Sequence, residues 1–336
     1  MLKNVLIISY YWPPSGGPGV QRVLKFCKYL SGFGWNPIVL TVEDGEFPAI
    51  DNSLLKDSIN IECIKVKGFS LFRIFKKLSG KKELPSHQLS PSRNETIITR
   101  IARWVRYNLI IPDGRIGWYR SAVKAGKKII KEKNIDMIFT SGPPQTVHLV
   151  GKSLADKTNT AWVSDFRDPW TDRFYYYENP RNKIISLLDN HLEKSVLKNC
   201  DYLVTVSNGF LSLLNQNFNI ENKSEIIYNG YDPEDFKKQK KINSSGDNII
   251  ISHLGSLSKS QNPIGLFKSI ISYNATKPEK LIIVNCIGSV HSDIERYASK
   301  SGLSDYLLKK PYVDHDQAIK EMINSDLLFL VIPDLV

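Results

Sequence analysis

Acidic and basic side chains cluster directly after a predicted strand in the middle of the chain. The segment reads Asp165-Phe166-Arg167-Asp168-Pro169-Trp170 and follows the apolar run 161–164. In open α/β sheets, ligands bind outside the carboxyl ends of the strands. Two carboxylates and a guanidinium in that position can orient a hydroxyl group, accept its proton or hold a phosphate. The alternative is an internal ion pair that shapes a tight loop before Pro169.

A glycine-rich loop follows the first predicted strand. Residues 10–22 read YYWPPSGGPGVQR, and a helical pattern begins at Val20. Glycines remove Cβ atoms where a backbone must approach a ligand closely, and a helix N-terminus offers free N–H groups to an anion. The pattern indicates a phosphate- or acceptor-binding turn made by Gly16, Gly17 and Gly19, with Arg22 one turn later. A strand–helix connection without a ligand is the alternative.

A histidine lies close behind another predicted strand end. The string Ser141-Gly142-Pro143-Pro144 forces an irregular loop, after which a helix begins. His148 falls in the first turn of that helix, near the same sheet edge, where it is a candidate for catalysis. A lone histidine is also common as a structural residue.

Three segments of the second half place polar side chains at turns. Segment 227–232 contains Asn229, segment 253–259 combines Gly255, Ser256 and Lys259, and segment 311–315 ends on His315. A turn of small residues with a lysine can hold a diphosphate through backbone N–H groups and charge. The segment that ends on His315 can supply a loop that contacts a base. For any one of these segments alone, a plain connecting loop is the simpler explanation.

Short apolar runs alternate with helical patterns, and this alternation positions the loops. With β-branched strands, it indicates an α/β fold whose parallel sheet is covered by helices on both faces. The expected strands are 5–9, 37–42, 61–66, 136–140, 161–164, 202–206 and 226–228, and the expected helices are 20–33, 97–107, 118–133, 144–157, 183–198 and 208–216.

A polar, charged segment at 235–247 is typical of a linker. A second α/β series with apolar runs at 249–254, 281–287 and 327–332 follows it. We therefore expect one domain over 1–234 and a second over 248–336. A parallel strand needs a crossover to reach its neighbour, and none follows the last run, so we expect the second domain to be incomplete.

Composition and length narrow the class of protein. Apolar residues make up 42% and charged residues 24% of the 336 residues, which is ordinary for a globular protein, and the length favours two domains. No run reaches the about 18 apolar residues of a membrane-spanning helix, and Met1 leads into a strand without a signal peptide. The scattered Cys27, Cys63, Cys200 and Cys286 show no metal-ligand spacing, so we expect reduced thiols in a cytoplasmic protein without a metal.

The net charge of +11 is unevenly distributed. Segment 71–82 (LFRIFKKLSGKK) combines five basic residues with large apolar ones and no acid, and more arginines and lysines lie between 100 and 128. Such a stretch suits an anionic membrane surface. A solvated basic face is an alternative. Nucleic acid is a weaker one, because no nucleic-acid-binding motif accompanies the charge.

Taken together, the motifs resemble the family 4 glycosyltransferases of the GT-B fold, most closely the bacterial members involved in surface polysaccharide synthesis. The resemblance covers nearly the whole chain in the expected order. Its matching pieces are 13–22, 141–148, 165–170, 206–209, 227–232, 254–257 and 325–328.

The resemblance implies two Rossmann-like domains with the active site between them, the N-terminal one for the acceptor and the C-terminal one for the nucleotide-sugar donor. It implies transfer of a sugar to a saccharide or lipid-linked acceptor, with retention of configuration and no metal or other cofactor. It implies Asp165, Arg167 and Asp168 beside the reacting sugar, Gly16 and Gly17 beside the donor phosphates or the acceptor, and Ser256 and Lys259 at the donor diphosphate. With the candidates argued above from their positions, the expected catalytic residues are Asp165, Arg167, Asp168 and His148. The expected substrate-binding residues are Gly16, Gly17, Gly19, Arg22, Asn229, Gly255, Ser256, Lys259 and His315.

Two departures from the family pattern matter. Ser256 stands where the family commonly has an arginine, and the E-x7-E segment that contacts the donor sugar would lie beyond Val336. We therefore expect the chain as given to be weakly active or inactive.

Two other functions remain open from the residues. A nicotinamide-dependent oxidoreductase is disfavoured because Gln21 and Arg22 stand where the third glycine of its motif belongs. A non-catalytic, basic binding module at a membrane surface is the main alternative.

Overall fold

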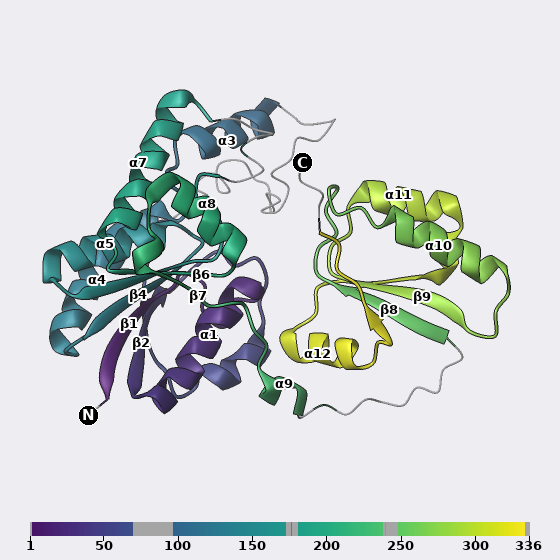
Figure 1. The fold of residues 1–336 in the computed structure, drawn as a ribbon, viewed down its shortest axis with the longest axis horizontal. Helices are drawn as coiled ribbons and strands as arrows, with labels where there is room; N and C mark the ends of the chain where they lie inside the picture. Colours follow the sequence, from purple (N-terminus) through teal and green to yellow (C-terminus); the bar gives the residue numbers. More distant parts are fainter. Residues whose placement is uncertain are drawn as a thin grey trace. The chain divides into compact units, whose positions relative to one another are not determined.

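The computed structural model describes residues 2–69, 97–172, 176, 181–237, 239 and 248–332. The chain divides into two compact units, the first comprising Met1–Pro48 and Leu55–Gly230, the second Ala49–Leu54 and Tyr231–Val336 (Figure 1). The basic stretch 71–82 and most of the predicted linker 235–247 lie outside the described residues. Within the described part, no helix is long and apolar enough to cross a bilayer.

The first unit is built on a seven-stranded sheet whose strands all run parallel. The central strands are continuous apolar runs because both faces of the sheet are covered by helices. In sheet order the strands are β3 (Glu62–Val66), β2 (Trp35–Val42), β1 (Lys3–Ile8), β4 (Met137–Gly142), β5 (Ala161–Phe166), β6 (Tyr202–Thr205) and β7 (Ser224–Ile226).

Helices cover both faces of this sheet. One face carries α4 (Tyr119–Glu132), α5 (Thr146–Thr158) and α7 (Lys183–Asn199), and α1 (Pro18–Leu30) covers the other (Figure 1). The apolar side chains of α1 recur at helical spacing, and Val20, Val23, Leu24 and Cys27 are buried. The remaining elements are α3 (Ile97–Asn108), α8 (Asn208–Phe218) and the 3₁₀ helices η1 (Ser31–Phe33), η2 (Asn52–Ser58), η3 (Ile116–Trp118) and η4 (Glu221–Lys223).

The second unit contains a parallel four-stranded sheet around its own core. Phe267, Val284 and Leu303 are fully buried there, and the segment Ala49–Leu54 joins this unit through Asp51, whose carboxylate accepts the His315 N–H at 2.8 Å. In sheet order the strands are β10 (Leu307–Lys310), β9 (Leu281–Ile287), β8 (Asn248–Leu254) and β11 (Leu327–Leu328), and the helices are α9 (Pro233–Lys237), α10 (Ile264–Ala275), α11 (Ser292–Ser301), η5 (Leu303–Tyr306) and α12 (His315–Ile323).

The expected α/β fold with parallel sheets is confirmed, and the elements differ from their expected bounds in a few places. The helix expected over 20–33 begins two residues earlier, at Pro18, and passes into η1, which Gly34 ends in the left-handed conformation at φ 82°. The predicted linker starts inside α9, because the charged residues Asp235 and Lys237 suit a linker but belong to this short helix. The short β10 was not expected because two of its four residues are lysines.

Candidate functional site

Three loops meet at the carboxyl edge of the first unit's sheet. Strand β1 lies between β2 and β4, so the sheet grows from β1 first on one side (β2, β3) and then on the other (β4 to β7). Ligands of open α/β sheets bind at the position where the strand order reverses in this way. Strand registers place Ile8 beside Thr140 and Gly142 beside Phe166. The glycine-rich loop, the Gly142 loop and the loop after Phe166 therefore lie side by side.

A buried ion pair joins α1 to strand β5. Arg22 donates from Nε to Asp165 Oδ2 at 3.1 Å and from Nη2 to Oδ1 at 2.9 Å. Ser141 Oγ donates to the same carboxylate at 2.6 Å. The side chain of Asp165 is fully buried, and Arg22 also donates to the Asn229 side-chain oxygen at 3.2 Å. Asp165 is thus a structural anchor of the edge rather than a group that faces solvent.

The Arg167 guanidinium locks two of the loops together. Its Nε donates to the Gly142 carbonyl at 2.9 Å, Nη1 to the Gly19 carbonyl at 2.6 Å and Nη2 to the Pro143 carbonyl at 2.9 Å. A Cβ on Gly19 would lie 3.2 Å from Arg167 Nη1, so a small residue is favoured there. Burial lowers the pKa of Arg167, while the nearby charges of Asp165 and Asp168 act in the opposite direction.

Asp168 is the carboxylate of this loop that reaches solvent. Its side chain is exposed and has no hydrogen bond or ion pair among the described residues. Because Arg167 holds the neighbouring backbone in place, Asp168 projects from a fixed loop at the ligand-binding edge. Its carboxylate is therefore available to a substrate.

His148 lies on the opposite face of the sheet from Asp165. Its Nδ1 is 2.9 Å from both Thr140 Oγ1 and Ser164 Oγ, and its ring stacks on Phe166 with centroids 4.4 Å apart. The ring is fully buried. Neighbouring residues of a strand point to opposite faces, so Ser164 contacts His148 while Asp165 contacts Arg22. The structure does not bring His148 together with the Arg22–Asp165 pair.

Acidification should destabilise the protein through His148. Burial lowers its pKa from 6.5 to about 3, with the charge of Arg167 contributing. Below pH 6.5 His148 binds a proton in the unfolded chain but stays neutral in the folded protein. The contribution of neutral His148 to stability is therefore complete above pH 6.5 and is lost as the pH falls toward 3. Between pH 7 and pH 5 we expect a loss of about 2 kcal/mol from this residue. Urea unfolding at both pH values measures it.

The matched variants for this experiment are His148→Gln and His191→Gln. The first should flatten the pH dependence, and the second should leave it unchanged because His191 is exposed. An equal pH dependence in the wild type and His148→Gln would contradict the assignment.

The Gly142 loop has no room for a side chain. A Cβ on Gly142 would lie 2.4 Å from His148 Nε2 and 2.8 Å from Gln145 Oε1. We expect Gly142→Ala to cost about 1–3 kcal/mol in the free energy of unfolding, because a rigid backbone and a packed ring must move. Gly209→Ala is the control, since no heavy atom lies within 4 Å of the added Cβ. Thermal unfolding compares the two, and equal melting temperatures would contradict the expected crowding.

Sequence reasoning missed two groups at this edge. Asp113 accepts hydrogen bonds from the Thr146 N–H at 2.8 Å and the Thr146 hydroxyl at 2.9 Å, and so fixes the start of α5. Gln145 is buried, and its amide has no hydrogen-bond partner among the described residues. Gln145 stands inside the motif that drew attention to His148, whereas no local signal connects Asp113 to Thr146.

Two small-residue turns lie side by side in the second unit. Gly255 has φ +138° and Gly288 has φ +124°, and a Cβ on Gly288 would lie 2.2 Å from the Gly255 carbonyl oxygen. Ser289 Oγ donates to Ser256 Oγ at 2.8 Å. These turns follow the neighbouring strands β8 and β9, and both Ser256 and Lys259 are exposed. The N–H groups of Gly255 and Leu257 donate to the Ile287 and Ser289 carbonyls, at 2.9 and 2.8 Å. The expected diphosphate turn thus offers the exposed Ser256 and the ammonium of Lys259, which has no hydrogen bond or ion pair among the described residues.

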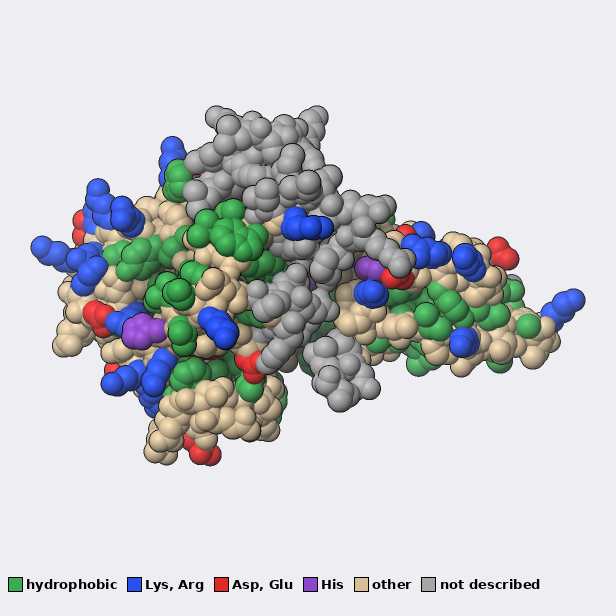
Figure 2. Space-filling model, turned by 90° about the horizontal axis from the view of Figure 1, so that it is seen from above, with side chains coloured by type: hydrophobic (Ala, Val, Ile, Leu, Met, Phe, Trp, Pro, Cys, Tyr) green, Lys and Arg blue, Asp and Glu red, His purple; other side chains and the backbone are tan. Residues whose placement is uncertain are grey.

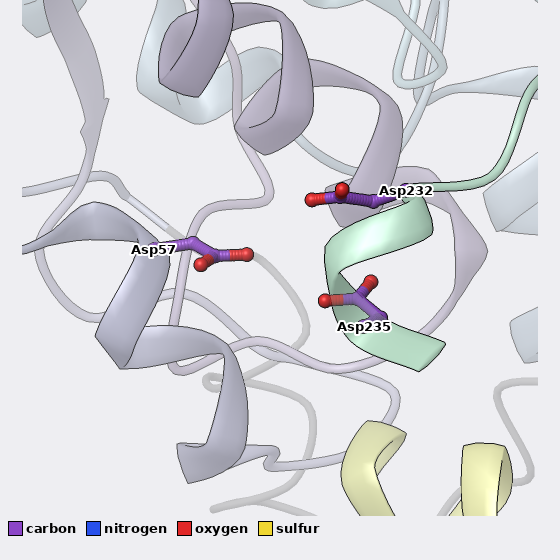
Figure 3. A group of neighbouring side chains, drawn as sticks. All are labelled: Asp57, Asp232 and Asp235. Atoms are coloured by element: carbon purple, nitrogen blue, oxygen red, sulfur yellow. The ribbon is translucent and has the colours of Figure 1, made fainter. Parts of the chain in front are cut away.

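His315 is engaged within the second unit. Its Nε2 is 2.9 Å from Asp235 Oδ2, and its ring is only 10% exposed. Figure 3 shows Asp235 with Asp232 at helix α9, and Asp57 on η2. Asp57 pairs with Lys25 at 2.6 Å, and Asp232 accepts the Glu234 N–H at 3.0 Å. Each of these three carboxylates thus has a hydrogen-bond or ion-pair partner of its own.

Comparison with known proteins identifies the family. The model of Glycosyltransferase Family 4 matches residues 19–235, well over half of the chain. The chain belongs to glycosyltransferase family 4. The predicted family is therefore confirmed, and with it the membership in a family of sugar-transferring enzymes. No curated protein matches the sequence significantly.

Solved structures show that this family 4 protein has the GT-B fold. It is similar to a sucrose-phosphate synthase from Thermosynechococcus elongatus, with 14% identity, a TM-score of 0.62 and coverage of 97% of this chain and 74% of that one. It is also similar to TarM, with 11% identity, a TM-score of 0.59 and coverage of 98% and 80%. A glycosyltransferase from Rickettsia africae shares 17% identity at a TM-score of 0.57, over 97% and 72%.

The roles of single residues in this family 4 protein stay predictions. The structure brings Gly19, Arg22, Asn229, Asp165 and Arg167 into one connected set. Asp168 is exposed beside that set, and His148 is buried on the other face of the sheet. In the second unit, Gly255, Ser256 and Lys259 share one turn, and His315 lies at the start of α12. Gly16 and Gly17 precede α1, and Gly17 takes φ +98°.

Proposed function

We propose that this family 4 protein transfers a sugar from a nucleotide-diphosphate sugar to a saccharide or lipid-linked acceptor, in the synthesis of a polysaccharide. The observation that carries the proposal is the exposed Asp168 on a loop held by Arg167, at the edge of the sheet where ligands bind. A fixed carboxylate in that position can orient an acceptor hydroxyl or stabilise positive charge that develops on the sugar.

The two units have different tasks in this proposal. The first unit binds the acceptor through the glycine-rich loop and the loop of Asp168. The second unit binds the donor, with Lys259 and the backbone N–H of Ser256 stabilising the diphosphate leaving group. Retention of anomeric configuration and independence of metal follow from the family resemblance and form part of the proposal.

Binding of a nucleoside diphosphate to the second unit tests the donor site. Lys259→Glu should weaken the binding of UDP or GDP by about tenfold or more, because a charge-assisted contact is replaced by repulsion. Lys280→Glu is the matched control, since Lys280 is equally exposed but directly precedes β9 and so lies at the opposite end of that strand. Isothermal titration calorimetry measures both. Equal affinities in the two variants would contradict the assignment of Lys259.

A cytoplasmic location at the inner face of the membrane completes the proposal. A lipid-linked acceptor would be presented there, and anionic lipids attract basic segments such as 71–82.

A further inference from the structure

The outward face of helix α7 carries large apolar side chains beside lysines. Ile184, Leu187 and Leu188 are exposed to 74%, 70% and 46%. Lys183 and Lys194 are exposed on the same helix, and their ammonium groups have no partner among the described residues. A single exposed leucine needs no explanation, but three large apolar side chains within five positions form a patch.

Both acids of α7 point inward. Asp189 is 1% exposed, accepts a hydrogen bond from Trp170 Nε1 at 2.8 Å and pairs with Arg181. Glu193 is 2% exposed and accepts a hydrogen bond from the Thr171 hydroxyl. The helix has no other acidic residue. Its outward face therefore offers apolar, neutral polar and cationic groups without a compensating negative charge.

A groove runs between α7 and α8 beside this patch. Its volume is about 770 Å³, and Leu187, His191 and Lys194 of α7 lie across from Asn217 and Phe218 of α8. Asp172 and the paired Asp189 also contribute to its wall. The size is that of a site for a small organic group. Its wall is mostly polar, with Leu187 and Phe218 as apolar members and Lys194 as a cation. A phosphate headgroup can pair with Lys194 there while its acyl chains continue over the neighbouring patch.

The end of α3 extends the same surface. The Asn182 N–H, just before α7, donates to Asn108 Oδ1 at the end of α3, at 2.8 Å. Near that junction Trp104 is 55% and Leu109 is 65% exposed, and α3 contains three arginines and no acid. Figure 2 shows hydrophobic and basic side chains interspersed on the described part of this face of the first unit.

We propose that α7, the end of α3 and the groove beside α7 form a docking surface for an anionic lipid bilayer. The apolar side chains enter the boundary between headgroups and acyl chains, and the lysines pair with lipid phosphates. A tryptophan at the rim suits the same boundary. This surface deepens the proposed location at the inner membrane and does not depend on which sugar is transferred.

Vesicle sedimentation tests the surface directly. The wild-type protein should bind vesicles of phosphatidylcholine mixed with phosphatidylglycerol more tightly than vesicles of phosphatidylcholine alone, and salt should weaken the binding. Ile184→Ser/Leu187→Ser and Lys183→Glu/Lys194→Glu should each weaken it by about tenfold or more. All four side chains are exposed, so the fold should persist, which circular dichroism checks.

Matched variants on other surfaces provide the controls. Phe33→Ser removes an equally exposed apolar side chain, and Lys124→Glu/Lys131→Glu reverses two exposed lysines of α4. Both should bind vesicles like the wild type. Equal binding by the α7 variants, or no lipid binding by the wild type, overturns the docking surface, and the second result would leave an acidic protein as the occupant to test.

A further variant shows whether this surface or the basic stretch 71–82 binds the membrane. It reverses the charges of Lys76, Lys77, Lys81 and Lys82. If only that variant loses lipid binding, the stretch binds the membrane and the α7 surface is wrong. UDP or GDP titrations of the same variants report on the donor site. Because the titration does not involve lipid, failure of the docking surface and failure of the proposed transfer are distinguishable.

Discussion

An Asp165→Asn variant is expected to lose about 3–5 kcal/mol of stability, because the change leaves the Arg22 guanidinium buried without its counter-charge. The carboxylate is fully buried and accepts three hydrogen bonds, two from Arg22 at 3.1 and 2.9 Å and one from Ser141 at 2.6 Å. A neutral amide has one acceptor oxygen where the carboxylate has two, so it cannot replace all three. Urea unfolding followed by circular dichroism measures the loss.

Two further variants test whether the loss comes from the ion pair itself or from a general sensitivity of the protein to substitution. Arg22→Met together with Asp165→Asn removes both charges, so the double variant should be more stable than the sum of the single losses predicts, by about 1–3 kcal/mol. Asp156→Asn breaks the more exposed pair with Lys152, at 2.7 Å, and should change stability by less than about 1 kcal/mol. Strictly additive losses at Arg22 and Asp165 would contradict a stabilising ion pair.

Much of the fold follows from local patterns. The run Val5–Ile8 is buried and central, and the Val20, Val23, Leu24 and Cys27 spacing makes a helix, because each pattern depends on a few neighbouring residues. Once strands and helices alternate, parallel pairing brings the loops after β1, β4 and β5 to one edge. The meeting of the glycine-rich loop with the loop of Asp165 could therefore be anticipated.

The roles of individual side chains at that edge do not follow from local patterns. Arg22 and Asp165 are 143 positions apart, and no local spacing shows that one neutralises the other. Side chains alternate between the two faces of a strand. The neighbours Ser164 and Asp165 therefore lie on opposite faces, where Ser164 contacts His148 and Asp165 contacts Arg22. His315 illustrates the same limit, because its partners Asp51 and Asp235 lie 264 and 80 positions away.

In a catalytically competent form of the protein, an Asp168→Asn variant is expected to turn over the donor at least about a hundredfold more slowly, with an unchanged free energy of unfolding. The carboxylate is exposed and has no hydrogen bond or ion pair among the described residues, so the fold does not depend on its charge. Its loop is nevertheless fixed, because Arg167 binds three backbone carbonyl groups. A carboxylate held in place at the edge where ligands of such sheets bind, with no hydrogen bond among the described residues, meets the requirement of a catalytic carboxylate.

Initial rates with the nucleotide sugar that binds, together with urea unfolding, distinguish Asp168 from Asp165. The Asp168→Asn variant should lose kcat and keep its stability, whereas Asp165→Asn should lose both, because Asp165 holds the sheet edge through Arg22. Glu132→Gln is the matched control, since Glu132 is exposed at the end of α4, which leads to the start of β4 and so to the opposite edge of the sheet. If Asp168→Asn retains its rate, the acceptor hydroxyl is oriented by another group, and the loop held by Arg167 has a structural role alone.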